Sequence, residues 1–345
     1  MCIRDRFSTL YIGFKVLSFL GGVLSDITGG RAVYVMLTAP PAMLLAAASL
    51  APSPLLLAII YVSLLATDLA QPGLTAILVS SVPRDALGTY FSIHRMVVLT
   101  ALAASSSILS LVYESLSLRA LMWASCALLT ASLAAALLLR EERGEQRARR
   151  ATPLDSIKLV SRHLRALSPY ILVVVLATFL TSVAAPFTRY YVVEVLGLSF
   201  LAVGLYESAS SLASLASQIP AGRAVDRFGE RVAFTASFAA NALSMLLFLI
   251  LAAYSPTLAL AALLIRSVFS PLYTNAYTSY AARRVKREVL SSFYGGLNSI
   301  SALTALLAPW AGYALWSANK ALPFAAYIAG MTILSIYSLR VLRGS

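Results

Sequence analysis

The sequence has little charge and almost no cysteine. Only 12% of its 345 residues are charged and 59% are hydrophobic, whereas soluble domains average about 25% charged and roughly 45–50% apolar residues. This composition excludes an ordinary soluble enzyme, and it excludes intrinsic disorder, which requires low hydrophobicity. The 17 glycines are too few for collagen. The two cysteines, Cys2 and Cys126, indicate no disulfide framework.

The sequence also lacks the common catalytic and nucleotide-binding motifs. No lysine follows a glycine, which excludes the Gly-Lys loop that binds ATP phosphates. Neither histidine begins a His-Glu-x2-His metal motif, and no Gly-x-Ser-x-Gly nucleophile motif occurs. We therefore expect no enzymatic activity, no bound metal and no cofactor.

Apolar stretches of about 20 residues recur along the whole chain, and each is long enough to cross a bilayer core of roughly 30 Å as a helix. A β-barrel would instead show alternating strands of about ten residues. We predict an all-α polytopic membrane protein. Eleven spans are expected near residues 8–25, 32–51, 55–80, 91–113, 118–139, 169–189, 200–221, 232–253, 256–280, 290–314 and 321–339.

The formal net charge of +13 suggests nucleic-acid binding, but the basic residues do not form one basic face. Twenty of the 27 lysines and arginines lie in alternate connections or in the C-terminal tail, and the opposite connections hold three. This is the positive-inside asymmetry of membrane proteins. It predicts a multi-pass protein of the cell membrane with a cytoplasmic C-terminus. We expect it to contact lipid and no nucleic acid, and to be a monomer.

The longest polar stretch, residues 141–168, predicts a cytoplasmic linker between an N-terminal half at 7–140 and a C-terminal half at 169–345. Its second half begins with Thr152, an N-cap residue followed by proline, and continues with amphipathic spacing. This pattern predicts a helix lying on the inner leaflet, with a solvated linker helix as the alternative. Residues 1–6 resemble a translated sequencing adapter and are excluded from the fold.

A four-residue pattern of the N-terminal half recurs 200 residues later. It comprises Gly22, Asp26, Gly29 and Arg31 in the first copy and Gly222, Asp226, Gly229 and Arg231 in the second. Residues 82–87 match residues 285–290 in the same way, at an offset of 203. The matches indicate two homologous halves of like orientation, related by an axis along the membrane normal.

Each part of this repeated loop has a physical interpretation. The first glycine permits close helix approach, and the second permits a turn. The aspartate can accept hydrogen bonds from the N-terminus of an adjacent helix, whose dipole favours a negative charge. The arginine offers a bidentate partner. A plain glycine turn is the alternative, which suits one copy better than two copies in register.

The repeated loop resembles the signature loop of the major facilitator superfamily, Gly-x3-Asp-(Arg/Lys)-x-Gly-(Arg/Lys)-(Arg/Lys). The first copy departs from it at Ile27 and Gly30, and the second keeps Arg227 but has Glu230 beside Arg231. The resemblance implies a bundle of two six-helix halves. It also implies that the loops latch the cytoplasmic side in the outward-open state.

The resemblance extends from about Leu10 to the end of the chain. It aligns the eleven spans with the second to twelfth spans of the family, so we expect the first of the twelve spans to be missing. In the family, the first, fourth, seventh and tenth spans line a central cavity. The resemblance therefore places Asp68 in the fourth span and Arg266 in the tenth.

Charged residues within spans are costly and are candidates for function. Lys15 and Asp68 are expected roughly 16–18 Å from the cytoplasmic end of their spans, near the midplane. Asp68 suits proton coupling or substrate binding, with an ion pair to Lys15 as the alternative. Arg266 suits an anionic substrate or a pair with Asp68.

Polar residues around these charges suit a cavity wall. Gln71 lies near Asp68, and Tyr273 and Asn275 follow Arg266, although the tyrosine can serve packing alone. Prolines interrupt the two corresponding spans, a pattern that points to a binding site between repeats.

We predict a secondary transporter of a small solute that works by alternating access, driven by a proton or solute gradient. The substrate, the direction and the coupling ion stay open. A multidrug efflux antiporter is one alternative, although residues 105–110 lack the Gly-Pro motif of such proteins. A non-transporting sensor or scaffold on the same fold is the other.

Overall fold

The computed structural model describes residues 15–50, 54–80, 82–83, 86–100, 118–138 and 161–342. These residues form helices and no strands, which confirms the predicted all-α class. The expected head at 1–6 and residues 141–160 of the expected linker at 141–168 lie outside the described residues. Six helical segments of the described part are long and apolar enough to cross a membrane: Gly30–Leu50, Val62–Val79, Ser168–Val195, Leu205–Ala252, Pro256–Arg284 and Leu322–Val341.

The chain divides into two compact units. Unit 1 comprises Met1–Ser81, Ala101–Ala166 and Arg284–Ala302, and unit 2 comprises Val82–Thr100, Leu167–Arg283 and Leu303–Ser345. Each unit therefore takes most of its residues from one half predicted by the sequence, together with one segment from the other half.

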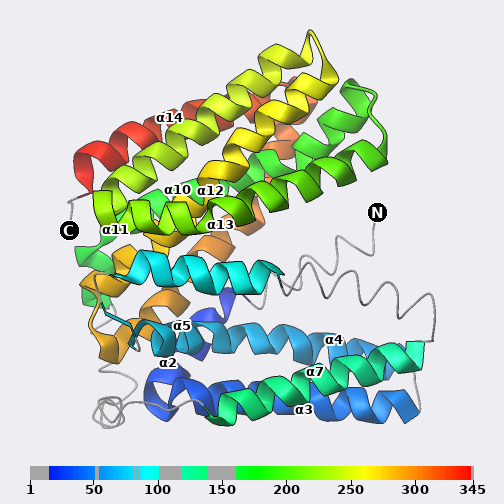
Figure 1. The fold of residues 1–345 in the computed structure, drawn as a ribbon, viewed down its shortest axis with the longest axis vertical. Helices are drawn as coiled ribbons and strands as arrows, with labels where there is room; N and C mark the ends of the chain where they lie inside the picture. Colours follow the sequence, from blue (N-terminus) through cyan, green and yellow to red (C-terminus); the bar gives the residue numbers. More distant parts are fainter. Residues whose placement is uncertain are drawn as a thin grey trace. The chain divides into compact units, whose positions relative to one another are not determined.

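Unit 1 is built on helices of the N-terminal half (Figure 1). Its elements are α2 (Ser18–Thr28), α3 (Gly30–Leu50), α4 (Pro54–Ala66), η1 (Thr67–Ala70), α5 (Gln71–Ser80) and α7 (Leu118–Leu138), together with the first part of α13 (Leu290–Ala318). Helices α3 and α7 lie side by side. Their contact includes Leu45, Ala48 and Met122, which are buried together with Ile60 of α4.

The span that contains Asp68 is irregular at that residue. Pro72 has no N–H to donate to the Asp68 carbonyl four residues earlier. The Gln71 N–H donates to this carbonyl instead, which tightens residues 67–70 into the 3-10 turn η1 between α4 and α5. The Thr67 hydroxyl donates to the Leu64 carbonyl at 2.6 Å. Asp68 thus lies where the helix is interrupted.

Unit 2 is built on helices of the C-terminal half. Its elements are the helical residues 87–100, α10 (Ser168–Tyr190), the π-helical turn η3 (Tyr191–Val195), α11 (Phe200–Ala252), α12 (Pro256–Arg284), the remainder of α13, and α14 (Leu322–Val341). Helix α14 contacts both α10 and α11. The Tyr170 and Tyr280 rings stack with centroids 4.6 Å apart, which fixes α10 against α12.

Helix α11 contains two of the predicted spans. Gly229 interrupts it with a non-helical backbone of φ 81° and ψ 163°. Gly29, the equivalent residue of the first copy, has φ 96° and lies between α2 and α3. A positive φ of this size favours glycine, because any side chain at such a position is strained. In both copies of the repeated loop the chain therefore turns at a glycine.

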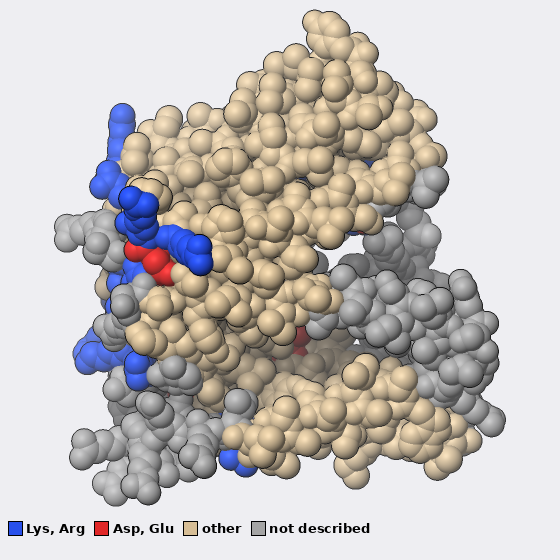
Figure 2. Space-filling model, viewed as in Figure 1, with Lys and Arg blue, Asp and Glu red and all other residues tan. Residues whose placement is uncertain are grey.

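Charge is concentrated at helix ends. On the face that Figure 2 shows, the lysine and arginine side chains gather at the ends of helices, and the helix flanks carry little charge of either sign. A lipid environment favours this distribution, since charged side chains on a flank would lose their hydration.

Candidate functional site

The second copy of the repeated loop contains a carboxylate that caps another helix. Asp226 of α11 accepts hydrogen bonds from the backbone N–H groups of Gly88 and Thr89, both at 2.8 Å, and from the Thr89 hydroxyl at 2.7 Å. The capped residues begin the helical segment 87–100, where N–H groups lack partners within their own helix. The helix dipole favours the negative charge at this end. We call this contact the Asp226 junction.

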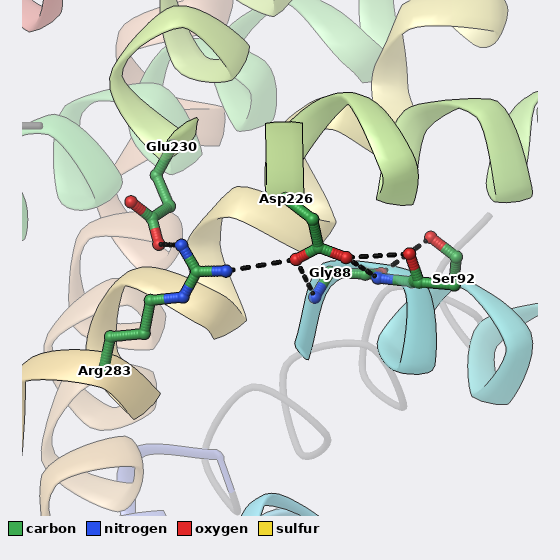
Figure 3. A network of polar contacts seen from close by, with 6 residues as sticks. Gly88, Ser92, Asp226, Glu230 and Arg283 are labelled. Carbon is green, nitrogen blue, oxygen red and sulfur yellow. Dashed lines mark hydrogen bonds and ion pairs between the residues drawn. The ribbon is translucent and has the colours of Figure 1, made fainter. Parts of the chain in front are cut away.

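An arginine links the Asp226 junction to a second acid. The Arg283 guanidinium lies 3.1 Å from an oxygen of Asp226 and 3.1 Å from an oxygen of Glu230. Figure 3 shows the Asp226 carboxylate between Arg283 and the helix start at Gly88. The Glu230 side chain is fully buried and that of Arg283 is 14% exposed, so solvent screens these charges weakly.

The helices of the Asp226 junction approach very closely. A Cβ atom on Gly222 would lie 2.6 Å from the Gly88 carbonyl oxygen, so α11 tolerates no side chain there. Ser92, one turn further along, donates to the Gly88 carbonyl at 3.0 Å and accepts from the Asn275 amide at 2.6 Å. Asn275 is 1% exposed. The structure therefore places Asn275, predicted for the cavity wall, in the packing behind the junction.

The first copy of the loop forms an equivalent contact in unit 1, which we call the Asp26 junction. Asp26 accepts hydrogen bonds from the Ser292 backbone N–H at 2.9 Å and from the Ser292 hydroxyl, both at the start of α13. A Cβ atom on Gly22 would lie 2.9 Å from the carbonyl carbon of Ser291. Burial raises the pKa of Asp26 to about 6, and the hydrogen bonds from Ser292 and Ser291 only partly oppose this effect.

The two junctions pair the sequence repeats crosswise. Asp226 follows Asp26 by 200 residues, and Ser292 follows Thr89 by 203 residues. Each aspartate therefore caps the helix start that belongs to the other half of the chain, at the equivalent position. The repeated segments of the sequence point to both aspartates and to both helix starts. They do not show which aspartate contacts which helix start.

The structure adds residues that the sequence interpretation missed. Arg283 forms the ion pair with Asp226, whereas the pattern suggested the arginine of the loop itself. Arg231 has a buried Nε atom without a hydrogen-bond partner among the described residues. In the sequence, Arg283 stands out only as part of a run of basic residues. The positive-inside asymmetry already explains that run, so nothing indicated a pair with Asp226.

Unit 2 also contains a cavity of about 300 Å³ among α10, α11, α12 and α14. Arg266 and Tyr273, two of the predicted site residues, line it. The complete lining is Ala177, Thr178, Thr181, Ser182, Ser237, Phe238, Asn241, Arg266, Ser270, Tyr273, Thr274, Tyr327 and Met331.

The remaining predicted site residues lie in unit 1. Asp68 is half-buried in η1, and Gln71 is exposed at the start of α5. Lys15 is half-buried at the beginning of the described residues. These residues keep the roles proposed for them as predictions.

The fold and the paired junctions define a polytopic membrane protein that is built from two repeated helical halves. The sequence profile of the Major Facilitator Superfamily matches residues 6–309, and the chain belongs to this family. Among curated protein sequences, no relative matches the chain.

Solved structures of transporters share the fold. The human organic anion transporter MFSD10 (TETRAN) is 17% identical, with a TM-score of 0.76 over 96% of this chain and 83% of that one. The proton:xylose symporter XylE is 13% identical, with a TM-score of 0.74 over 98% and 85%. The fucose:proton symporter FucP of E. coli is 15% identical, with a TM-score of 0.71 over 96% and 89%. At these identities the likeness establishes the fold.

Proposed function

We propose that the protein is a secondary active transporter that moves a small solute across the cell membrane by alternating access. The carrying observation is the pair of equivalent aspartate junctions. Each joins a loop of one half of the chain to a helix start of the other half. Both junctions must break before the two halves of the chain can separate at the helix ends where the repeated loops lie. The two junctions therefore act as a latch.

The energy of such a latch suits a reversible switch. A hydrogen bond to a charged group contributes about 1.5–3 kcal/mol, and conformational equilibria of proteins involve differences of a few kcal/mol. A handful of bonds at each junction is therefore enough to hold one state, and the binding of a solute can compensate for their loss.

The arrangement in the membrane follows from the charge asymmetry. The basic loops, which include both junctions, face the cytoplasm together with the C-terminus. Breaking the latch therefore opens the inward-facing state. The protein works as a monomer in this proposal, with membrane lipid around it and a small-molecule substrate inside.

A proton gradient is the driving force we favour. Two of the fold relatives are described as proton symporters of sugars, and the third as a transporter of organic anions. Asp68 supplies a carboxyl group at an interrupted point of a span, and acids within spans are typical of proton pathways.

Reconstitution in liposomes tests this proposal. Labelled xylose, fucose and benzoate serve as probes, and an imposed pH gradient should drive uphill accumulation of at least one of them. Asp68→Asn should abolish this accumulation but retain downhill exchange, because exchange requires binding and alternation without net proton movement. Glu194→Gln, which makes the same acid-to-amide change at an exposed residue of η3, is the matched control.

Retained pH-driven accumulation in Asp68→Asn would rule out proton coupling through this residue and favour its ion pair with Lys15. A sensor or scaffold would instead tolerate Asp68→Asn and show no alternation in response to a ligand.

A further inference from the structure

We propose that the cavity of unit 2 binds a small organic anion whose acidic group is held by Arg266. This inference rests on the proposed transport function and narrows its substrate class.

The lining of the cavity is positively charged and otherwise neutral. Arg266 is the charged residue among the thirteen that line it, and the lining contains no aspartate or glutamate. Arg266 lies ten residues into α12, about 15 Å along the helix from Pro256. A guanidinium at this depth loses hydration and is stabilised by an anion.

The acids of unit 2 that the structure describes form ion pairs with other arginines or lie outside the cavity lining. Glu207 pairs with Arg189 at 2.7 Å, and Asp226 and Glu230 both pair with Arg283 at 3.1 Å. The fourth, Glu194, is exposed in η3. None of these four acids lines the cavity, so the described part of unit 2 offers Arg266 no carboxylate there.

Neighbouring polar groups orient the arginine and complete the site. The Tyr327 hydroxyl donates to the Asn241 side-chain oxygen at 2.8 Å, and its own oxygen lies within electrostatic reach of Arg266. Hydroxyl groups of other lining residues, such as Ser182 and Ser270, can donate to the remaining oxygens of a ligand. A planar guanidinium binds a carboxylate through two parallel hydrogen bonds, which also fixes the direction of the ligand.

The size and apolar part of the cavity restrict the ligand further. A volume of 300 Å³ equals about ten water molecules at roughly 30 Å³ each, so it suits a molecule of about that many non-hydrogen atoms. Phe238, Tyr273 and Met331 supply an apolar and aromatic wall. This combination favours a carboxylate on a ring or short carbon skeleton over a bare inorganic ion.

Binding to the purified protein in neutral detergent tests the inference without requiring transport. Two pairs of probes differ mainly in charge: benzoate against benzamide, and glucuronate against glucose. Calorimetry should show that at least one anion binds more tightly than its neutral partner. Arg266→Gln should reduce the affinity for this anion by about tenfold or more, which is the loss expected for hydrogen bonds to a charged group.

Two further variants separate the role of Arg266 from general effects. Arg266→Lys keeps the charge but loses the two parallel N–H donors of the guanidinium. It should therefore bind the anion with an affinity between those of the native protein and Arg266→Gln. Arg189→Gln removes the same charge from an exposed ion pair of unit 2 and should bind like the native protein. If Arg266→Gln does not fold, the weaker binding of Arg266→Lys carries the test.

Several results would overturn the inference. They are failure of all four probes to bind, equal binding of the neutral partners, anion binding that survives Arg266→Gln, or a response to phosphatidylglycerol or inorganic phosphate in place of the carboxylates. Transport of a neutral probe by Arg266→Gln would support the proposed transport function and contradict only the anion site. Arg266-dependent anion binding without any transport would support the anion site and contradict the transport function.

Discussion

The Asp26 and Asp226 junctions share one geometry but differ in how they balance the charge. Asp226 has Arg283 beside it, and Arg283 also reaches Glu230. In the sequence of the N-terminal half, the positions equivalent to Arg283 and Glu230 hold Ser80 and Gly30. Gly30 has no room for a side chain, since a Cβ atom there would lie 2.8 Å from the Gly73 carbonyl oxygen.

This difference shows that two copies of one motif can become specialised. The Asp226 carboxylate is held by a buried ion pair and by the helix start that it caps. The Asp26 carboxylate is held by the hydroxyl and N–H groups of Ser292 and Ser291, and burial raises its pKa to about 6. We therefore expect the Asp226 junction to supply most of the strength of the latch and the Asp26 junction to respond to pH.

The largest effect is expected from Asp226→Asn. The change removes one of the two acids paired with the buried Arg283 and also the charged cap of the helix start at Gly88. Breaking a buried ion pair by removing one partner costs up to about 3–5 kcal/mol. The equilibrium should shift strongly toward the inward-open state. Leu87→Cys, a fully buried position at the start of the capped helix, should then react faster with a thiol reagent added from the cytoplasmic side. The native cysteines are first replaced by serine, and Asp226→Glu is the control that keeps the charge.

A smaller shift in the opposite direction is expected from Asp26→Asn at about pH 7.5. The asparagine oxygen can still accept from Ser292, and the closed junction no longer has to bury the ionised carboxylate, whose burial raises the Asp26 pKa to about 6. Leu290→Cys is the matched reporter, because Leu290 is 1% exposed and equivalent to Leu87 in the repeat. An Asp26→Asn effect larger than that of Asp226→Asn would contradict the proposed division of roles. Unchanged reactivity in both variants would mean that the loops are only turns.

The smallest effect is a pH dependence of the Asp26 junction. The closed junction has an Asp26 pKa of about 6, above the ordinary value of 3.8 that an open, solvated junction restores. The closed state therefore binds more protons, so its added stability is complete below about pH 3.8 and is lost as the pH rises through 6. Acidification from about pH 7.5 to 5 should favour closure by roughly tenfold.

The measurement is the reactivity of Leu290→Cys at both pH values, corrected for thiol ionisation with an exposed cysteine peptide. Reactivity should fall on acidification, and Asp26→Asn should remove the dependence. The same experiment on Leu87→Cys is the internal comparison. A rise in Leu290→Cys reactivity at low pH would show that the sign of the coupling is wrong.

Local patterns in the sequence were sufficient for the fold class and for many helix positions. The span expected at 256–280 corresponds to α12 (Pro256–Arg284), because the thickness of a bilayer sets the length of an apolar helix. The turn at Gly229 could be recognised inside α11, since a positive φ is a property of one residue and its neighbours. The repeat itself required only a comparison of the two halves.

The tertiary structure determined which residues contact one another. The Asp26 contact joins residues 266 positions apart, and Asn275 bonds to Ser92 across 183 positions. Arg283 became the partner of Asp226 because the packing of α11 against α12 brings the two side chains within 3.1 Å. Four helices contribute to the cavity around Arg266. A sequence specifies hydrophobic length, turn residues and capping chemistry position by position, whereas hydrogen bonds, ion pairs and cavities depend on distances between helices that only the packed chain defines.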